Sequence, residues 1–233
     1  MTQIKIGITY TTSRLDYYID WIAQGVQGAE PQVLGPDCQP KNVVESLHAL
    51  VLTGGVDIFP SFYGGPIHYP GAPEAFLPDR DLIEMELYFR ARRRGIPVLA
   101  ICRGVQLVAV AEGAPLIQDL TSQGFQDHGR RTDGSDSEHL VRVDGSRFFD
   151  SQSEIWVNSA HHQALRQAPA GFKITGWSVP DEVPEILESI YEEPFFLGVQ
   201  WHPERSHLKS EKFHAASLKT LRFFREAIQR FAR

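Results

Sequence analysis

Two short stretches carry side chains that could do covalent chemistry, and the first of them ends in a cysteine. Residues 98–101 are apolar, follow a turn signal at 95–97 and read as a buried strand, and Cys102 stands between that strand and a helical pattern. A cysteine at such a turn lies at the end of the sheet, where the positive end of the helix dipole favours its thiolate. Cys102 is therefore a candidate nucleophile, and a small buried apolar residue is the equally weighted alternative.

The second stretch, residues 195–204, reads as an apolar strand that runs into His202, Pro203 and Glu204. If the extended geometry persists, His202 and Glu204 lie on one face, because side chains two positions apart in a strand share a face. The carboxylate could then orient the imidazole and support its charged form, while the other ring nitrogen addresses a thiol. A surface His–Glu pair is the alternative reading of this stretch.

A third feature is the turn Gly54-Gly55, which follows an apolar run at residues 48–53. Glycine allows a substrate to approach the backbone closely, so the amides of such a turn can hold a developing negative charge. A cysteine nucleophile, an anion hole and a late His-x-Glu sequence are together the parts needed for acyl transfer through a covalent intermediate.

The elements that must position these residues follow an α/β pattern. Strands predicted at residues 4–8, 32–34, 48–53 and 98–101 alternate with helices predicted at 15–22, 43–47, 79–93 and 105–111. This alternation implies a mostly parallel sheet with helices on both faces, and ligands of such sheets bind beyond the carboxyl ends of the strands. The turns at residues 54–55 and at Cys102 should therefore face one crevice.

The second half of the chain has a strand-like period. Apolar segments at residues 140–143, 155–157, 172–175 and 186–190 are separated by Gly and Asp turns, which predicts a smaller antiparallel or mixed portion of the sheet. Residues 209–233 carry apolar side chains at helical spacing and should form a closing amphipathic helix that serves packing.

Composition sets the class of protein. A chain of 233 residues that is 42% hydrophobic can bury a full core, and without a Ser/Gly linker we expect one domain over residues 1–233. The net charge of −6 argues against a nucleic-acid partner. Cys38 lies in a predicted loop and Cys102 at the end of a predicted core strand, so we predict no disulfide between them. No apolar run reaches the length of a membrane span. The start of the chain lacks a signal-peptide pattern. We therefore expect a cytoplasmic protein with no membrane partner.

Two segments are rich in acidic residues that could bind a metal ion or begin a helix. The polar segment 121–138 shows no metal-ligand spacing, so we predict a solvated loop and no metal site; it contains Asp127, His128, Asp133, Asp136 and Glu138. Asp79, Asp81 and Glu84 begin a predicted helix, with Asp79 as its N-cap. Arg80 could also reach back to the nucleophile turn through a salt bridge.

Four stretches together carry a resemblance to a known family: 52–55 (LTGG), 101–106 (ICRGVQ), 157–163 (VNSAHHQ) and 198–204 (GVQWHPE). The chain resembles the class I glutamine amidotransferase-like proteins, and within them the peptidase C26 branch of γ-glutamyl-γ-aminobutyrate hydrolases. The resemblance implies a flavodoxin-like three-layer sandwich. It also implies that Cys102 is the nucleophile, His202 the general base and acid, and Glu204 the residue that orients His202, with the amides of Gly55 and Arg103 as the oxyanion hole.

The resemblance further suggests which residues border a glutamyl pocket, namely Gln106, Asn158, Ser159, His161 and His162. Asp57, Tyr63, Asp79 and Arg80 also match the branch's pattern. Three positions depart from that pattern: Ala109 stands in place of Asn, Ala114 in place of Gly, and Glu182 where an Asp-Gly turn is usual before Glu185. None removes a triad member, but the Glu182 loop leaves the amine half of the substrate open.

The implied activity is hydrolysis of a γ-glutamyl amide to glutamate and an amine, with γ-glutamyl-γ-aminobutyrate or a related compound as the small-molecule substrate and no cofactor. Two alternatives stay open: a glutaminase subunit that delivers ammonia to a separate synthetase, and a non-catalytic γ-glutamyl-binding protein. A homodimer is a common arrangement among similar proteins.

Overall fold

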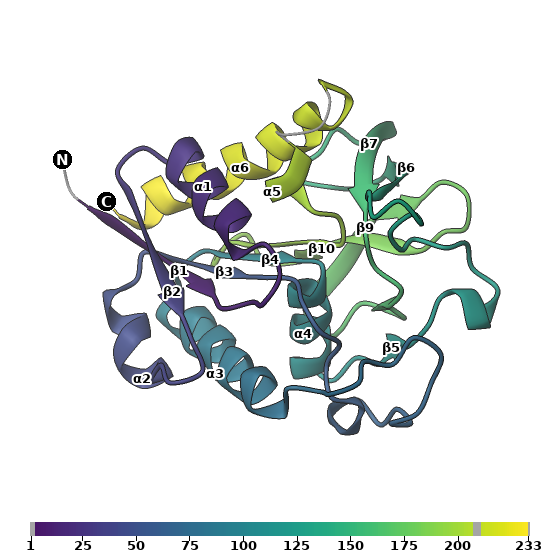
Figure 1. The fold of residues 1–233 in the computed structure, drawn as a ribbon. Coiled ribbons are helices and arrows are strands. Elements are labelled where there is room, and N and C mark those ends of the chain that lie inside the picture. Colours follow the sequence, from purple (N-terminus) through teal and green to yellow (C-terminus); the bar gives the residue numbers. More distant parts are fainter. Residues whose placement is uncertain (1–2, 207–210, 233) are drawn as a thin grey trace.

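One mixed sheet runs through the molecule and carries helices on both faces (Figure 1). The computed structural model describes residues 3–206 and 211–232. The sheet has nine strands in the order β2-β1-β3-β4-β11-β10-β9-β6-β7, and β5 (Leu116–Ile117) and β8 (Ala164–Leu165) form a separate antiparallel pair. The expected α/β sandwich with a smaller antiparallel portion is confirmed.

The first half of the sheet is parallel. It consists of β2 (Ala29–Leu34), β1 (Ile4–Thr9), β3 (Ala49–Leu52), β4 (Val98–Ile101) and β11 (Phe196–Val199). Register sets Ile101 opposite Val199, so β4 and β11 end at the same edge. Because parallel strands share their carboxyl ends, the turns that follow β3, β4 and β11 meet at that edge.

The second half of the sheet is antiparallel and continues directly from β11. Its strands are β10 (Pro184–Ser189), β9 (Phe172–Ser178), β6 (Ser137–Val143) and β7 (Ser153–Ser159). Each of these strands extends beyond the apolar core of the segment predicted for it, because polar residues at strand ends still pair through the backbone.

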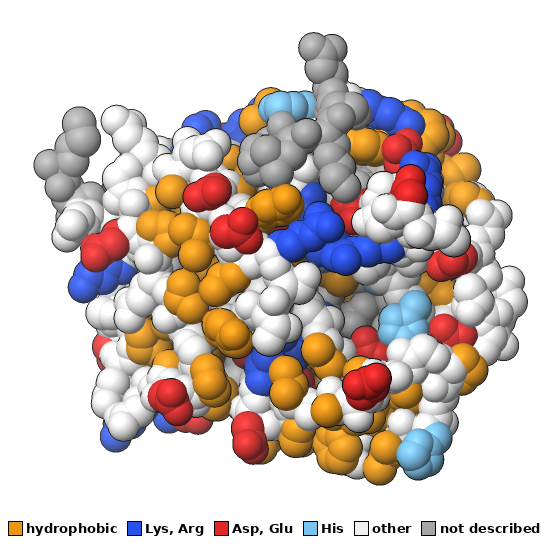
Figure 2. All heavy atoms as spheres, in the orientation of Figure 1, with side chains coloured by type: hydrophobic (Ala, Val, Ile, Leu, Met, Phe, Trp, Pro, Cys, Tyr) orange, Lys and Arg blue, Asp and Glu red, His pale blue; other side chains and the backbone are white. Residues whose placement is uncertain are grey.

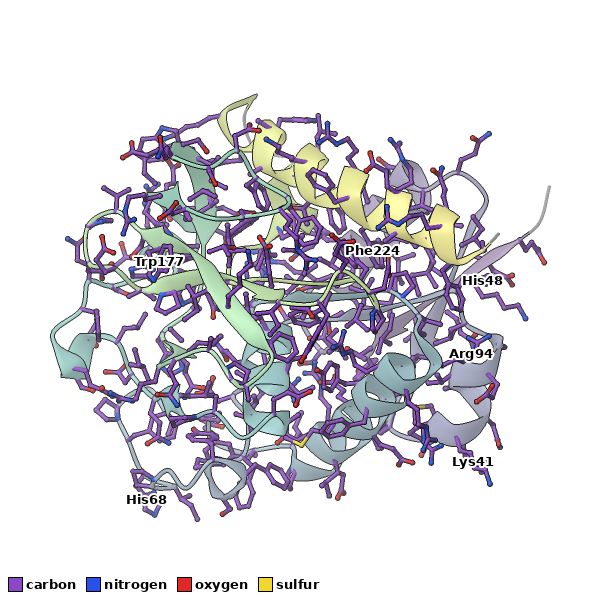
Figure 3. The ribbon with its side chains drawn as sticks, turned by 180° about the vertical axis from the view of Figure 1, so that it is seen from behind. Lys41, His48, His68, Arg94, Trp177 and Phe224 are labelled. Carbon is purple, nitrogen blue, oxygen red and sulfur yellow. The ribbon has the colours of Figure 1, made fainter. Side chains whose placement is uncertain are left out.

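Alternation of side chains along the buried strands divides the core between the two faces. In β3, Ala49 and Val51 join the cluster under α1 (Leu15–Gly25) and α6 (Glu211–Phe231), while Leu50 and Leu52 join the cluster under α3 (Pro78–Arg94) and α4 (Arg103–Ala111). Phe224, labelled in Figure 3, is fully buried between α6 and the sheet. Because both faces are covered, the central parallel strands β3, β4 and β11 are buried and apolar on both sides.

Helix boundaries near residues 40 and 78 differ from the sequence prediction. The helix expected at residues 43–47 is instead a short α2 (Pro40–Val43) followed by a 3₁₀ turn. α3 begins at Pro78 with Leu77 as its N-cap residue, so the prediction of Asp79 as N-cap was wrong, since proline is well suited to the first helical position. The closing helix is confirmed over Glu211–Phe231, and residues 209, 210 and 233 of that prediction lie outside the described residues. No helix in the part of the chain described here is long and apolar enough to cross a membrane.

Candidate active site

The candidate nucleophile lies on a strained turn between β4 and α4. Cys102 has φ 53° and ψ −111°, a backbone conformation that L-residues rarely adopt. Its amide donates to the Val199 carbonyl oxygen at 2.8 Å, which ties the turn to β11. Gly104 allows this tight turn, because a Cβ there would lie 2.3 Å from the Leu52 carbonyl oxygen. The sequence placed Cys102 at this turn correctly.

The second candidate catalytic pair is formed by His202 and Glu204, which are buried and joined by a 2.7 Å contact between His202 Nδ1 and Glu204 Oε1. The backbone between His202 and Glu204 is not the continuous strand that the sequence predicted. β11 ends at Val199, and Pro203 begins the short helix α5 (Pro203–Ser206). The chain therefore turns between the two residues, because Pro203 cannot continue a sheet ladder and fits the first turn of a helix.

Charges around His202 favour its protonated form. Burial and the Arg205 guanidinium act to lower the pKa of His202, but the Glu204 carboxylate and Cys102, which also forms a hydrogen bond to it, leave that pKa raised above its ordinary value. Burial acts to raise the pKa of Glu204, but His202 and Arg205 lower it below its ordinary value. Glu204 is therefore an anion that supports an imidazolium at His202.

The two amides predicted as the oxyanion hole have no competing acceptor. Within the part of the chain that the structure describes, the N–H groups of Gly55 and Arg103 donate to no protein group, and Arg103 is the first residue of α4, where no intrahelical acceptor exists. The neighbouring Gly54 amide is occupied, since it donates to Tyr18 Oη at 3.0 Å. Gly55 has φ 144°, which favours glycine. The arrangement leaves these two amides able to hold an oxyanion.

The side chain of Arg103 anchors the nucleophile turn to α3. It is buried and forms ion pairs with both Asp81 and Glu84. Arg80, which precedes both acids in α3, donates to the Gly54 carbonyl oxygen at 2.9 Å and pairs with Glu84 at 2.8 Å. Arg80 thus reaches the Gly-Gly turn through a hydrogen bond. Asp81 and Glu84 therefore do more than stabilise the start of α3. Through Arg103 and Arg80 they hold the Cys102 turn and the Gly54-Gly55 turn at the carboxyl edge of the sheet.

The Glu84 ion pair should give the protein an acid-sensitive component of stability. Although burial acts to raise it, the pKa of Glu84 is lowered below its ordinary value of 4.5 by Arg103 and Arg80. A lowered folded-state pKa contributes stability above pH 4.5, and that contribution is lost as the pH falls through the folded-state pKa. We expect Glu84→Gln to lower the free energy of unfolding by about 3–5 kcal/mol at neutral pH and by much less in acid. Urea unfolding followed by tryptophan fluorescence at several pH values measures both; an equal loss at every pH would contradict the assignment.

Of the sequence-predicted substrate residues, Gln106, Asn158 and Ser159 do not line the cavity that contains Cys102, and their side chains form hydrogen bonds inside the protein. Gln106 Nε2 donates to the Gln163 carbonyl oxygen at 2.9 Å and to Gln200 Oε1 at 3.2 Å. Asn158 Nδ2 donates to Asp136 at 2.9 Å, and Ser159 Oγ donates to the His128 carbonyl oxygen at 2.8 Å. These contacts give the three residues a supporting role around the cleft, and their contact with substrate stays a prediction.

The adjacent histidines point in different directions. His161 Nδ1 donates to the Gln163 carbonyl oxygen at 2.9 Å, and its Nε2 lies 3.4 Å from Glu185. His162 lies between two carboxylates, 2.9 Å from Asp57 and 3.4 Å from Asp119. Neither histidine lines the cavity that contains Cys102. Sequence adjacency thus does not place them in one pocket.

That cavity has a volume of about 340 Å³ and includes Cys102, His202, both glycines of the Gly-Gly turn and Ala160. Arg130 and Arg205 also line it, and the sequence reading identified neither. Basic side chains gather over the centre of the face drawn in Figure 2. No local spacing singles out Arg130, whereas Arg205 directly follows Glu204 and could have been found there. A larger cavity of about 380 Å³, lined by Asp79 and Arg80 among others, contains none of Cys102, His202 and Glu204.

Arg205 also supports the triad. Its Nη1 lies 3.1 Å from Asp136 and its Nε lies 3.3 Å from Glu204 Oε1. Asp136 in turn accepts the hydrogen bond from Asn158. A buried chain of charge and hydrogen bonds therefore connects β7 to Glu204.

The prediction of a solvated loop at residues 121–138 was wrong for two of its charged residues. His128 and Asp136 are 3% and 4% exposed, whereas Asp127, Asp133 and Glu138 are exposed as expected. Both buried residues find partners distant in sequence: His128 pairs with Asp181, and Asp136 with Arg205. Such partners leave no spacing signal within the loop itself.

The three departures from the family pattern lie away from the triad. Ala109 and Ala114 are buried in the core cluster under α3 and α4. Glu182 has φ 60° in the turn between β9 and β10, the conformation that a glycine would favour, and its side chain pairs with Arg142 at the surface at 2.5 Å. The turn is thus kept without the usual residues.

Comparison with known proteins gives a consistent result. The chain matches the family model described as Peptidase C26 over residues 14–204. It is 34% identical over 214 residues to Protein NtpR of Enterococcus hirae, covering 88% of each chain. It is 32% identical over 193 residues to the gamma-glutamyl-gamma-aminobutyrate hydrolase PuuD of Escherichia coli strain K12, covering 78% of this chain and 74% of that one. A solved structure from Thermoplasma acidophilum, described as a candidate component of GMP synthase, shares the fold, with a TM-score of 0.71 at 17% identity over 100% of this chain and 97% of that one.

The matched region extends from the start of α1 to Glu204 and contains all four stretches that carried the resemblance: 52–55, 101–106, 157–163 and 198–204. The fold agrees, since the central sheet and its flanking helices are those of the solved relative. The chain therefore belongs to the peptidase C26 family.

Proposed function

We propose that this protein is a cysteine hydrolase that cleaves γ-glutamyl amides, with Cys102 as nucleophile, His202 as general base and acid, and Glu204 as the residue that orients His202. The observation that carries the proposal is the meeting of a cysteine on a strained turn, a buried His–Glu pair and two unoccupied amides at the carboxyl edge of one sheet. The names of relatives such as PuuD support a γ-glutamyl substrate.

The proposed reaction has two halves. His202 accepts the thiol proton while Cys102 Sγ bonds to the γ-carbonyl carbon, and the amides of Gly55 and Arg103 hold the oxyanion. The C–N bond then breaks, His202 gives its proton to the leaving amine, and a γ-glutamyl thioester remains. Water, deprotonated by His202, attacks the thioester, the C–S bond breaks, and glutamate and the free thiol are released. One imidazole serves both half-reactions, because His202 gives away the proton that it accepted in each half before the next half begins.

Glu204 makes this cycle efficient. Its contact with His202 Nδ1 fixes the ring so that Nε2 faces the nucleophile, and its charge stabilises the imidazolium that forms in each half-reaction. Arg205 and Asp136 hold the carboxylate in place. Glu204, Arg205 and Asp136 are thus buried, and their opposite charges are paired before substrate binds.

Arg130 is the group that fits the α-carboxylate of a γ-glutamyl substrate. It lines the cavity beside Cys102, and its guanidinium side chain is partly exposed, so it is free to contact a ligand there. Its contact with the protein is loose, since Arg130 Nε lies 3.9 Å from Asp136. A guanidinium suits bidentate binding of a carboxylate.

We expect Arg130→Ala to raise KM for γ-glutamyl amides by about tenfold to a hundredfold, the value of one hydrogen-bonded charge pair, with a smaller effect on kcat. Arg131→Ala is the matched control, because Arg131 is adjacent, more exposed and absent from the cavity lining. Steady-state kinetics of both variants measures the difference. Equal KM values in the two variants would exclude Arg130 from substrate binding.

Glutamate release by the purified protein tests the proposed function directly. The substrates are γ-glutamyl-γ-aminobutyrate, other γ-glutamyl amides, poly-γ-glutamate and glutamine, each without any partner protein. We expect turnover of at least one γ-glutamyl amide well above that of glutamine. Preference for glutamine would instead indicate a glutaminase, and activity on none of them would overturn the proposal of a stand-alone hydrolase.

A further inference from the structure

A second cluster of chemically active side chains lies in the antiparallel half of the molecule, outside the catalytic cavity. His128 comes from the loop before β6, His139 from β6, His161 from the segment after β7 and Glu185 from β10, and all four side chains are buried. Their ring nitrogens surround one carboxylate oxygen. Glu185 Oε1 lies 3.1 Å from His139 Nε2, 3.4 Å from His161 Nε2 and 3.5 Å from His128 Nδ1.

These separations are those between neighbouring donors of a small metal ion. Zn²⁺ bonds imidazole nitrogen at about 2.0–2.1 Å and carboxylate oxygen at about 2.0–2.2 Å, so two donors of a tetrahedral ion lie about 3.3 Å apart. One donor atom each from His128, His139 and Glu185 all lie within 4.8 Å of one another. The side chains would need only small rotations to share an ion.

The outer ring nitrogens are held as in metal-binding histidines. His128 Nε2 lies 3.2 Å from Asp181 Oδ2, and His161 Nδ1 donates to the Gln163 carbonyl oxygen. A carbonyl oxygen or carboxylate that accepts from one ring nitrogen fixes the ring and directs the other nitrogen to the ion. Two of the three imidazoles thus turn a nitrogen toward Glu185 with this outer support.

The inward-facing atoms also lack other partners. Among the described residues, His128 Nδ1, His161 Nε2 and Glu185 Oε2 are buried without a hydrogen bond. Buried polar atoms are nearly always paired, and three unpaired atoms around one carboxylate call for a shared partner. A divalent cation bound by His128 Nδ1 and the Glu185 carboxylate would satisfy two of these three atoms together.

A route to the cluster exists from the surface. His128 and His139 line a cavity of about 250 Å³ that also includes Trp156 and Pro180. No residue lines both this cavity and the one that contains Cys102. An ion could therefore reach the histidines without passing through the catalytic cleft.

We propose that His128 Nδ1, His139 Nε2 and the Glu185 carboxylate bind one divalent transition-metal ion, with Zn²⁺ as the best match to two imidazoles and a carboxylate. His161 borders the site. This assignment differs from the sequence expectation of no metal, and it is independent of the proposed hydrolase activity. Its role is structural: the ion joins the loop before β6 to β6 and β10, and through His161 and Gln163 it braces Gln106, four positions after Cys102.

Metal titration of the Cys102→Ala protein tests the proposal, because removing the thiol removes the competing soft ligand at the catalytic cavity. The protein is treated with a chelator, dialysed and titrated with Co²⁺, followed by visible absorption, and then with Zn²⁺ in competition. We expect one equivalent of Co²⁺ bound with ligand-field bands, displacement by one equivalent of Zn²⁺, and a higher Tm with metal than with chelator.

Variants locate the ion. We expect His139→Gln and Glu185→Gln to weaken binding by more than about a hundredfold, since loss of an outer partner alone costs about 10–100-fold. His68→Gln is the control, because His68 is an exposed histidine at the periphery of the molecule (Figure 3). Circular dichroism checks folding, and His128→Gln, on a loop, replaces any variant that does not fold.

Two results would overturn the site. One is a folded Cys102→Ala protein that binds no stoichiometric metal and has the same Tm with and without chelator, which would leave a proton-sharing network as the explanation. The other is unchanged affinity in the folded His139→Gln or His128→Gln protein, which would place the ion elsewhere. Both readouts are free of turnover, so failure of the hydrolase proposal would not affect them.

Discussion

Replacing Cys102 by alanine should abolish hydrolysis while the fold remains. Without Sγ no thioester can form, and loss of a nucleophile that acts as a unit with its base costs about 10⁵-fold or more in kcat. The backbone of Cys102 has a positive φ, which alanine tolerates no better and no worse than cysteine, so the turn between β4 and α4 should persist. We therefore expect loss of activity with little change in Tm.

Glutamate release and thermal unfolding, measured on the same preparation, check this result. Cys38→Ala is the matched control, because Cys38 is the other cysteine, half-buried in the loop after β2 and remote from the cavity. It should retain wild-type turnover. Turnover within about a hundredfold of wild type in a Cys102→Ala protein would rule out the covalent mechanism, since far larger losses follow removal of a nucleophile.

Replacing Glu204 by glutamine should lower kcat by about 10³–10⁴-fold, the range seen when the acid of a Ser–His–Asp triad becomes an amide. The amide carries no charge to stabilise the imidazolium, and it can present its N–H to His202 Nδ1, which favours the wrong tautomer. Arg205 also loses one of its ion-pair partners and keeps Asp136. The change acts on the orientation and charge of His202, and KM should change less than kcat.

The pH profile separates this positioning role from a general loss of stability. Glu204 is one of the groups that raise the pKa of His202, so its neutralisation should lower that pKa. His202 acts as a base from its neutral form, so the acidic limb of the kcat/KM profile, where its imidazolium loses the proton, should then move to lower pH. Glu226→Gln, at a partly exposed position on α6, is the control for loss of one negative charge. An unmoved acidic limb in Glu204→Gln would show that Glu204 does not act through His202.

Much of the parallel half of the fold could be read directly from the chain. The strands around residues 50 and 100 are continuous apolar runs bounded by glycine or proline, and the strand-to-helix turn at Cys102 is encoded within ten residues. Features of this kind are local, because the burial of a strand and the end of a helix depend on neighbours a few positions away. The candidate nucleophile and the Gly-Gly turn were therefore predicted at their correct places.

The route from His202 to Glu204 was predicted less well. The two residues are joined as expected, but a turn into α5 brings them together where a continuous strand was predicted. Pro203 fits either reading, since it both ends a strand and begins a helix. Only the packing of α5 against its neighbours decides between them.

The sequence by itself determined the order of the elements, the turn that carries Cys102 and the choice of Cys102, His202 and Glu204 as candidate catalytic residues, because each depends on short-range pattern. The tertiary structure decided which charges are buried together. Arg103 meets Asp81 and Glu84, and Glu185 meets His128 and His139, across separations of about 20 to 60 residues. The physical reason is that burying a charge is unfavourable unless a partner neutralises it, and that partner is supplied by whichever element packs alongside, wherever it lies in the chain.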